Sequence, residues 1–155
     1  MAEMELIKET GDVELLSFRI SEQEYSLDIM SVREIRSWTK ATPLPHSPSY
    51  VRGVINLRGT VLPIIDLSAR LGLEKSEQSE RDVIIVVHMF DQTVGLLVDA
   101  VIDILAVPHN EMQQPPEIGT DTGPAFVNAL TLVEGRMIRL LDLASIMPRT
   151  EGKAA

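Results

Sequence analysis

The stretch LRGTVLPIIDL, residues 57–67, recurs 76 positions later as VEGRMIRLLDL, residues 133–143. Each copy has a glycine near its start, continues with a mostly apolar run of strand length, and ends on an aspartate followed by a leucine. Repetition of one supersecondary unit constrains the architecture of a whole chain. The sequence therefore predicts two copies of the same β-rich unit.

A second repeated block lies upstream, at an offset of 69 residues. Leu16, Phe18 and Ile20 alternate as in a strand, as do Ile85, Val87 and Met89, and a second extended segment follows each of these stretches, at 25–29 and 94–98. Because the offset grows from 69 to 76, seven residues are added between the blocks in the second half. We expect them in the loop-like segment 114–124, which is rich in proline and glycine.

Each half thus contains about five short strands separated by turn signals. This pattern predicts an all-β fold and favours a small barrel over a parallel sheet, which needs crossover helices. Helices should be single turns, with Asp66 and Asp142 as their N-caps. We expect a flexible acidic tail at 1–13, one domain at 14–148 with a linker near 74–82, and a second tail at 149–155.

Composition excludes several classes of function. The 155 residues are 45% hydrophobic, enough for a core, and contain no cysteine, which excludes disulfides and thiolate chemistry. A net charge of -9 without a basic stripe argues against binding to nucleic acid or anionic lipid. No segment approaches the roughly 20 apolar residues of a membrane span, and the acidic start is unlike a signal peptide.

Catalytic and metal-binding patterns are weak. Asp121-Thr122-Gly123 matches the aspartic-protease tripeptide, but no apolar strand precedes it and no second copy exists, so an Asx turn is the alternative. The histidines His46, His88 and His109 lack metal-ligand spacing. We expect no metal and no cofactor, because phosphate loops and nucleophile elbows are absent from the sequence as well.

Two charged residues are candidates for recognition. Arg58 lies beside Gly59 at a hairpin tip, where it is either a solvated turn residue or a guanidinium presented to a partner, and its counterpart Glu134 has the opposite charge. Strict strand alternation would turn Glu34 to the same face as Val32 and away from Ile35. Glu34 is either an exposed strand residue or the partner of Arg58 beside an apolar groove between two lobes.

These residues belong to motifs that resemble the CheW family of chemotaxis coupling proteins, over about residues 14–147. The motifs are YSLDIMSVREI at 25–35, VRGVINLRG at 51–59, LPIIDL at 62–67 and VGLLVD at 94–99. Their order and spacing together make the resemblance specific.

The resemblance implies two intertwined SH3-like five-stranded barrels with short helical turns. It also implies a non-catalytic adaptor without cofactors, present in the cytoplasm and recruited to membrane receptor clusters. Such a protein couples transmembrane chemoreceptors to the histidine kinase CheA and supports kinase control and receptor array assembly. An aspartic-type hydrolase that uses Asp121 is the alternative.

The family's receptor-binding groove, in which the cytoplasmic tip of a chemoreceptor docks, is carried over to nine positions. Glu34 and Arg58 would be its polar pair, whereas barrel core is the alternative role for the aliphatic members, above all Val83 and Val98. The implied receptor-binding residues are Val32, Glu34, Ile35, Asn56, Arg58, Val83, Gly95, Val98 and Ile104.

The kinase contact is less well located. The regulatory domain of CheA resembles the family module itself, which implies a contact of barrel against barrel. Trp38 and Tyr50 flank the Pro43-Leu44-Pro45 loop, and they are either kinase-binding aromatic residues or parts of the core.

Overall fold

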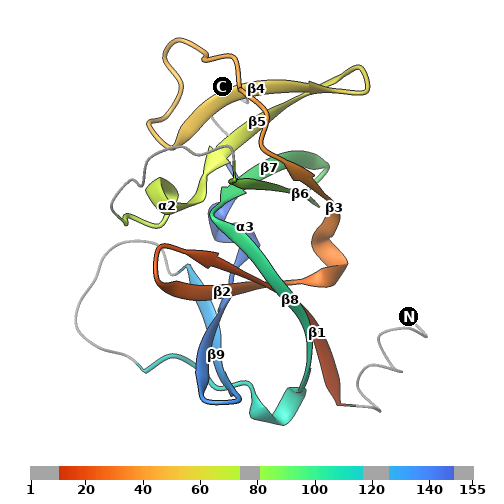
Figure 1. Cartoon of the computed structure of the whole chain (residues 1–155), viewed down its shortest axis with the longest axis vertical. Helices are drawn as coiled ribbons and strands as arrows, with labels where there is room; N and C mark the ends of the chain where they lie inside the picture. The colour runs from red at the N-terminus through yellow and green to blue at the C-terminus, as the bar shows by residue number, and fades with distance from the viewer. Residues whose placement is uncertain (1–10, 74–80, 117–125, 149–155) are drawn as a thin grey trace.

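The computed structural model describes residues 11–73, 81–116 and 126–148, and these residues form an all-β fold, as predicted (Figure 1). Ten strands within the described residues build two five-stranded sheets. The only helices there are single turns, and none of them has the length and hydropathy of a membrane span.

The two sheets, here called sheet A and sheet B, have equivalent strand orders. Sheet A has the order β8-β1-β2-β10-β9, with the bounds Ala100–Pro108, Asp12–Ile20, Gln23–Asp28, Arg136–Leu141 and Val127–Val133. Sheet B has the order β3-β6-β7-β5-β4, with the bounds Val32–Ser37, Val83–Met89, Gln92–Val98, Thr60–Asp66 and Val51–Leu57. Each sheet takes strands from both halves of the sequence, so the predicted intertwining is confirmed.

The duplication extends to the details of strand register. Leu16 pairs with Leu27 in sheet A as Ile85 pairs with Leu96 in sheet B, and both offsets are 69. A β-bulge leaves Ile102 unpaired in β8, and the same bulge falls at Arg33 in β3. The two halves therefore share one backbone plan, bulges included.

Each half contributes its first hairpin, β1–β2 or β6–β7, to the sheet that contains the other three strands of the opposite half. This exchange of hairpins follows from the short connection between β2 and β3. Asp28 lies beside Leu15 on one side of β1. If β3 paired with β1 in the register that β8 uses, Val32 would lie beside Phe18 on the other side. Asp28 and Val32 would then be three residues apart along the strands and two strand spacings apart across β1. At ~3.4 Å per residue and ~4.8 Å between strands, this distance is about 14 Å.

The chain from Asp28 to Val32 cannot make this return. The four residue steps from Asp28 to Val32 span about 14 Å only when the chain is fully extended, and the path around β1 would be longer than this direct distance. In the structure the connection is instead wound into the 3₁₀ turn η1 (Ile29–Ser31). β3 therefore pairs with β6 of the other half.

The core has a central part between the sheets and a second part on sheet B. The central core draws on both sheets, and its fully buried members include Leu16, Phe18, Ile65, Ile85 and Leu96. The sheet B core consists of Ile55, Leu57, Leu62, Ile64, Ile84, Val86 and Leu97. The central core ties the halves into one folding unit.

Both predicted helix caps are present. Asp66 precedes α2 (Leu67–Arg70) and accepts from the backbone N–H of Ala69, and Asp142 precedes α3 (Leu143–Ile146) and accepts from that of Ala144. The two caps differ in their surroundings. Asp66 is buried and also accepts from Ser68 Oγ at 2.8 Å and from Arg52 Nη2 at 2.8 Å.

Two boundaries differ from the sequence-based expectation. β1 begins at Asp12, inside the expected tail at 1–13, because its first residues pair with the long strand β8. The seven extra residues are also divided. The bridges Thr42–Val54 and Gln113–Leu130 are equivalent, yet Thr42 and Gln113 are only 71 positions apart, so two of the seven precede Gln113. The 3₁₀ turn η2 (His109–Glu111) lies in that stretch.

The two caps provide a matched test of the fold. Asp142→Ala should lower the free energy of unfolding by about 1 kcal/mol, the usual cost of a lost N-cap. Asp66→Ala should cost roughly 3 kcal/mol, because it also leaves the Arg52 guanidinium unpaired beside the core. Urea denaturation of both variants measures the difference, and equal costs would contradict the role given to Arg52.

Candidate functional site

Arg58 stands at the tip of the hairpin β4–β5. Leu57 pairs with Thr60, and the two residues between them, Arg58 and Gly59, have φ values of 51° and 86°. A two-residue loop with both φ values positive is a type I′ turn, in which asparagine, aspartate or glycine is usual at the first position. Asn56 supports the turn by accepting the Gly59 N–H through Oδ1 at 2.9 Å.

The turn itself does not require a cation. The equivalent hairpin β9–β10 has the same turn, with Glu134 at 51° and Gly135 at 81°. A long side chain at positive φ is unfavourable in both hairpins, and such positions cluster at functional sites. Since the same turn forms with either charge, the backbone conformation does not explain the arginine at residue 58.

Glu34 faces the side of sheet B opposite to the predicted one. The bulge at Arg33 places Val32 beside Val87 and Glu34 beside Val86, which are neighbours on β6 and face opposite sides of the sheet. Val32 packs against the central core, whereas Glu34 lines a pocket together with Leu57, Leu62 and Val86 of the sheet B core. The predicted alternation, with Glu34 and Val32 on one face, is therefore wrong, because a bulge adds one residue to the strand.

Glu34 and Arg58 form an ion pair through Glu34 Oε2 and Arg58 Nη2. Arg36 Nη1 approaches the other carboxylate oxygen of Glu34 at 3.4 Å. The hydrogen bond from Arg58 lowers the pKa of Glu34, and Arg36 adds a smaller effect in the same direction. The same hydrogen bond raises the pKa of Arg58. The carboxylate thus stays charged at neutral pH between two guanidinium groups.

A pocket of about 420 Å³ opens beside this ion pair, and we call it the sheet B pocket. Its floor is apolar and consists of Leu57, Leu62 and Val86, all of which belong to the sheet B core. Its polar lining residues come from both halves of the sequence and are Arg33, Glu34, Arg58, Thr60, His88 and Thr93. The pocket thus combines an apolar floor with charged and hydroxyl-bearing side chains around it.

The remaining residues of the predicted receptor site divide by burial. Ile35 and Ile104 are 47% and 54% exposed on the edge strands β3 and β8. Val98 is 2% exposed in the central core, and Val32 and Val83 pack partly against that core. Val98 thus belongs to the core, the alternative expected for the aliphatic members, and Val32 and Val83 lie at its margin.

Gly95 is buried where the sheets leave no room for a side chain. A Cβ atom there would lie 2.7 Å from Ile64 Cδ1 and 2.8 Å from Ile84 Cγ2. Gly95 therefore packs closely within sheet B and has no side chain to expose.

The two aromatic residues proposed for the kinase contact lie apart. Trp38 is half-buried against the sheet B core, and Tyr50 is half-buried against the central core. Tyr50 also lines a groove of about 910 Å³ together with the exposed Leu44. Arg70 covers the Tyr50 ring at 4.5 Å from its centroid.

Sequence reasoning missed Arg70 and the walls of the sheet B pocket. Arg70 donates to the carbonyl oxygens of Ser145 and Ile146, at 2.8 and 3.1 Å, and so joins α2 to α3. Thr60 and Thr93 look unremarkable as single residues. The repeat did contain a signal for them, because the residues equivalent to Thr60 and Thr93 are Arg136 and Glu24.

The alternative chemistries gain no geometric support. Asp121 lies outside the described residues. Within the described ranges, no group of three histidine or acidic side chains comes together as a metal site. His88 Nδ1 is instead 2.7 Å from Thr93 Oγ1, its cross-strand neighbour.

Comparison with known proteins gives a consistent result. The family model described as the CheW-like domain matches residues 14–151. The chemotaxis protein CheW of Rhizobium meliloti is 52% identical over 145 residues, which cover 94% of each chain. The chemotaxis protein CheW of Klebsiella aerogenes is 32% identical over 146 residues, covering 94% of this chain and 88% of that protein.

A solved structure agrees with the sequence relatives. The crystal structure of the scaffolding protein TtCheW from Thermoanaerobacter tengcongensis superimposes with a TM-score of 0.77 at 35% identity. The match covers 84% of this chain and 88% of that one. The shared fold therefore extends over both sheets and is not limited to one repeat.

The charge state of Glu34 is a direct test of the site. In Arg58→Ala the pKa of Glu34 should rise toward its ordinary value, because its strongest hydrogen bond is lost, whereas Arg36→Ala should raise the pKa less. A carboxyl whose pKa is lowered by folding stabilises at neutral pH, and that contribution disappears as the pH falls through its folded pKa. NMR titration of the Glu34 carboxyl carbon measures its pKa in both variants. A rise in Arg36→Ala equal to or larger than that in Arg58→Ala would contradict the ranking of the two arginines.

Proposed function

The chain belongs to the CheW-like family, and from that membership we propose that it is a chemotaxis adaptor, which couples transmembrane chemoreceptors to the histidine kinase CheA. The match of the family over residues 14–151 carries this proposal. The protein is a scaffold and not an enzyme, and it supports kinase control and the assembly of receptor arrays. We place it in the cytoplasm, at membrane receptor clusters, with residues 14–148 as its binding module.

The receptor contact is proposed around the Glu34–Arg58 pair. Arg58 is 67% exposed at the rim of the sheet B pocket, and Ile35 and Ile104 offer apolar surface on the edge strands. Asn56 orders the turn that presents Arg58. These features are what a helical receptor tip requires, namely apolar surface with a polar pair that sets orientation.

Four predicted receptor residues act indirectly in this proposal. Val32, Val83, Gly95 and Val98 lie in or against the cores, so we assign them to the shape of the surface rather than to contact with the receptor. Substitution of such a residue would alter receptor binding only by moving the strands that carry the exposed residues.

The kinase contact is proposed on the side of the Pro-rich loop between Trp38 and Tyr50. Leu44 is 46% exposed there at the edge of the groove that Tyr50 lines. The half-buried rings of Trp38 and Tyr50 would hold the loop while Leu44 meets the regulatory domain of CheA.

The adaptor function is tested by binding. The purified protein should bind both a chemoreceptor signalling fragment and CheA, and a mixture of all three should stimulate CheA autophosphorylation. Binding to neither partner would refute the proposal. No named relative is a hydrolase, so peptide cleavage that depends on Asp121 is not expected.

Charge reversal at the two equivalent turns separates a receptor contact from a general charge effect. Arg58→Glu should weaken binding of the receptor fragment about tenfold, ~1.4 kcal/mol, and leave the thermal midpoint almost unchanged. Combining it with Glu34→Arg should recover part of the affinity, because the pair is restored in reverse. Glu134→Arg, the matched control, should bind normally. Isothermal titration calorimetry measures all four proteins.

The kinase contact has its own test. Leu44→Glu should weaken CheA binding about tenfold, since a charge would enter an apolar contact. Leu132→Glu on sheet A, where the leucine is 58% exposed, is the matched control and should bind CheA as the wild type does. If both variants bind CheA equally well, the Pro-rich loop is not the kinase surface.

A further inference from the structure

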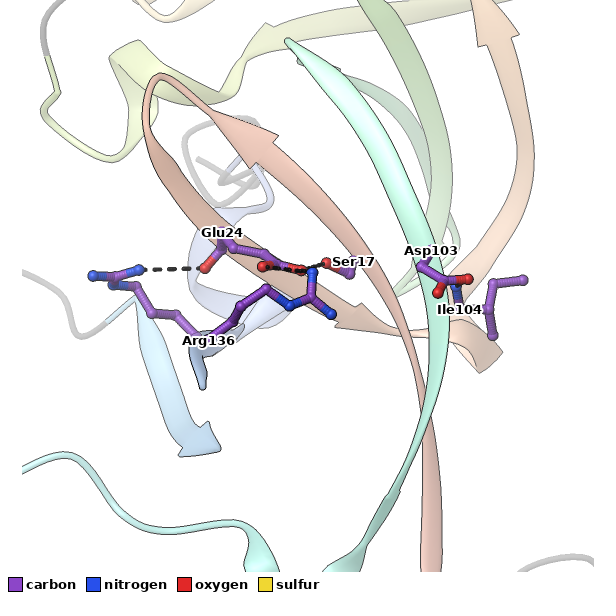
Figure 2. Close-up of polar contacts among 6 residues, drawn as sticks. Ser17, Glu24, Asp103, Ile104 and Arg136 are labelled. Carbon is purple, nitrogen blue, oxygen red and sulfur yellow. Dashed lines mark hydrogen bonds and ion pairs between the residues drawn. The ribbon is translucent and has the colours of Figure 1, made fainter. Parts of the chain in front are cut away.

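Sheet A and sheet B treat the same position of the fold in opposite ways. In sheet A the position is filled by a partly buried polar triad: Ser17 Oγ donates to Glu24 Oε2, and Arg136 Nη1 donates to Glu24 Oε1 and Oε2 at 3.2 and 3.1 Å. Figure 2 shows the side chains of Ser17 and Arg136 converging on the Glu24 carboxylate. The Glu24–Arg136 ion pair joins β2 to β10, which come from different halves of the sequence.

In sheet B the same position is open. The offsets of 69 and 76 residues map Ser17 to Val86, Glu24 to Thr93 and Arg136 to Thr60. Because two threonines replace a glutamate and an arginine, the space that the ion pair occupies in sheet A becomes part of the sheet B pocket. The position is therefore filled by side chains in sheet A and open in sheet B.

The pocket has a distinct chemistry. Its floor of Leu57, Leu62 and Val86 is between 1% and 8% exposed, which suits methylene groups. Two guanidinium groups, Arg33 and Arg58, line it against one carboxylate.

That one carboxylate is already engaged. Glu34 is shared between Arg58 and Arg36, so the rim has a positive excess on a protein of net charge -9.

Sheet A presents the opposite charge at its equivalent rim. Asp103 is the counterpart of Glu34, and Glu134 is the counterpart of Arg58. Figure 2 shows Asp103 apart from the triad, and its Oδ1 accepts the backbone N–H of Ile104. An anionic group would be repelled there and attracted at sheet B.

We propose that the sheet B pocket is a socket for one acidic side chain of the receptor, whose methylene stem lies on the apolar floor and whose carboxylate reaches Arg33 and Arg58. This assignment rests on the proposed adaptor function. It accounts for the cation at residue 58, where the equivalent turn has Glu134, and for the open position that is filled in sheet A.

The duplication supplies the experiment. Thr60→Arg combined with Thr93→Glu installs in sheet B the ion pair that fills sheet A, while Glu34 and Arg58 stay in place. The variant should keep a cooperative melt and lose at least tenfold in affinity for the receptor signalling fragment. The reciprocal Glu24→Thr, Arg136→Thr variant opens the sheet A position and should bind the fragment normally at a temperature where it is folded.

The receptor side is tested with the same fragment, in which each acidic residue of the tip is changed in turn from Glu to Gln or from Asp to Asn. One change should weaken binding to the wild type and have little further effect on the plugged variant. That coupling identifies the inserted side chain.

The outcomes distinguish the socket from the adaptor function. If the wild type binds the receptor fragment and the plugged variant binds it equally well, the socket is refuted and the adaptor function stands. If the plugged variant does not fold, Arg33→Glu decides, since unchanged affinity in that exposed-residue variant would overturn the proposal. If the wild type binds neither the receptor fragment nor CheA, the adaptor function itself fails.

Discussion

The architecture depends on a connection that is too short. Only three residues, Ile29–Ser31, separate Asp28, the end of β2, from Val32, the start of β3, and they cannot cross β1 to complete a sheet within the first half. The equivalent step from Leu97 to Val101 has the same length, so each half must give its hairpin to the other. The exchange buries the two hairpins against each other in the central core, and Arg70 joins the halves again through the end of α3. A protein assembled in this way has no repeat that is complete alone.

The candidate site is a product of that exchange. Glu34 and Arg58 come from the first half of the sequence, whereas Val86, His88 and Thr93 come from the second. They surround one pocket only because β3 and β5 pair with β6 and β7. The surface proposed for the receptor is thus supported by strands from both halves, and its geometry depends on the same pairings that hold the core together.

The two sheets share one backbone plan but differ in the side chains of their interiors, and this difference makes the molecule asymmetric. The interior of sheet A buries Ser17, Ser26 and Thr131, whose counterparts in sheet B are Val86, Gly95 and Ile55. Buried polar groups are tolerated only when they are hydrogen-bonded, and here Ser26 donates to the Arg139 carbonyl and Thr131 to that of Glu111. Sheet A is therefore closed by a polar network, and sheet B keeps an open apolar floor.

The sequence by itself determined the repeat, the all-β class, the two aspartate caps and the family motifs, because these depend on local spacing and on turn chemistry. It also marked Arg58 through its contrast with Glu134. Only the tertiary structure decided the face of Glu34, because the bulge at Arg33 is defined by pairing with β6. It likewise decided that Val98 fills the core while Ile104 stays exposed. Burial, bulges and pockets arise from contacts between residues far apart in the chain, and strand alternation carries no record of which neighbour a side chain will meet.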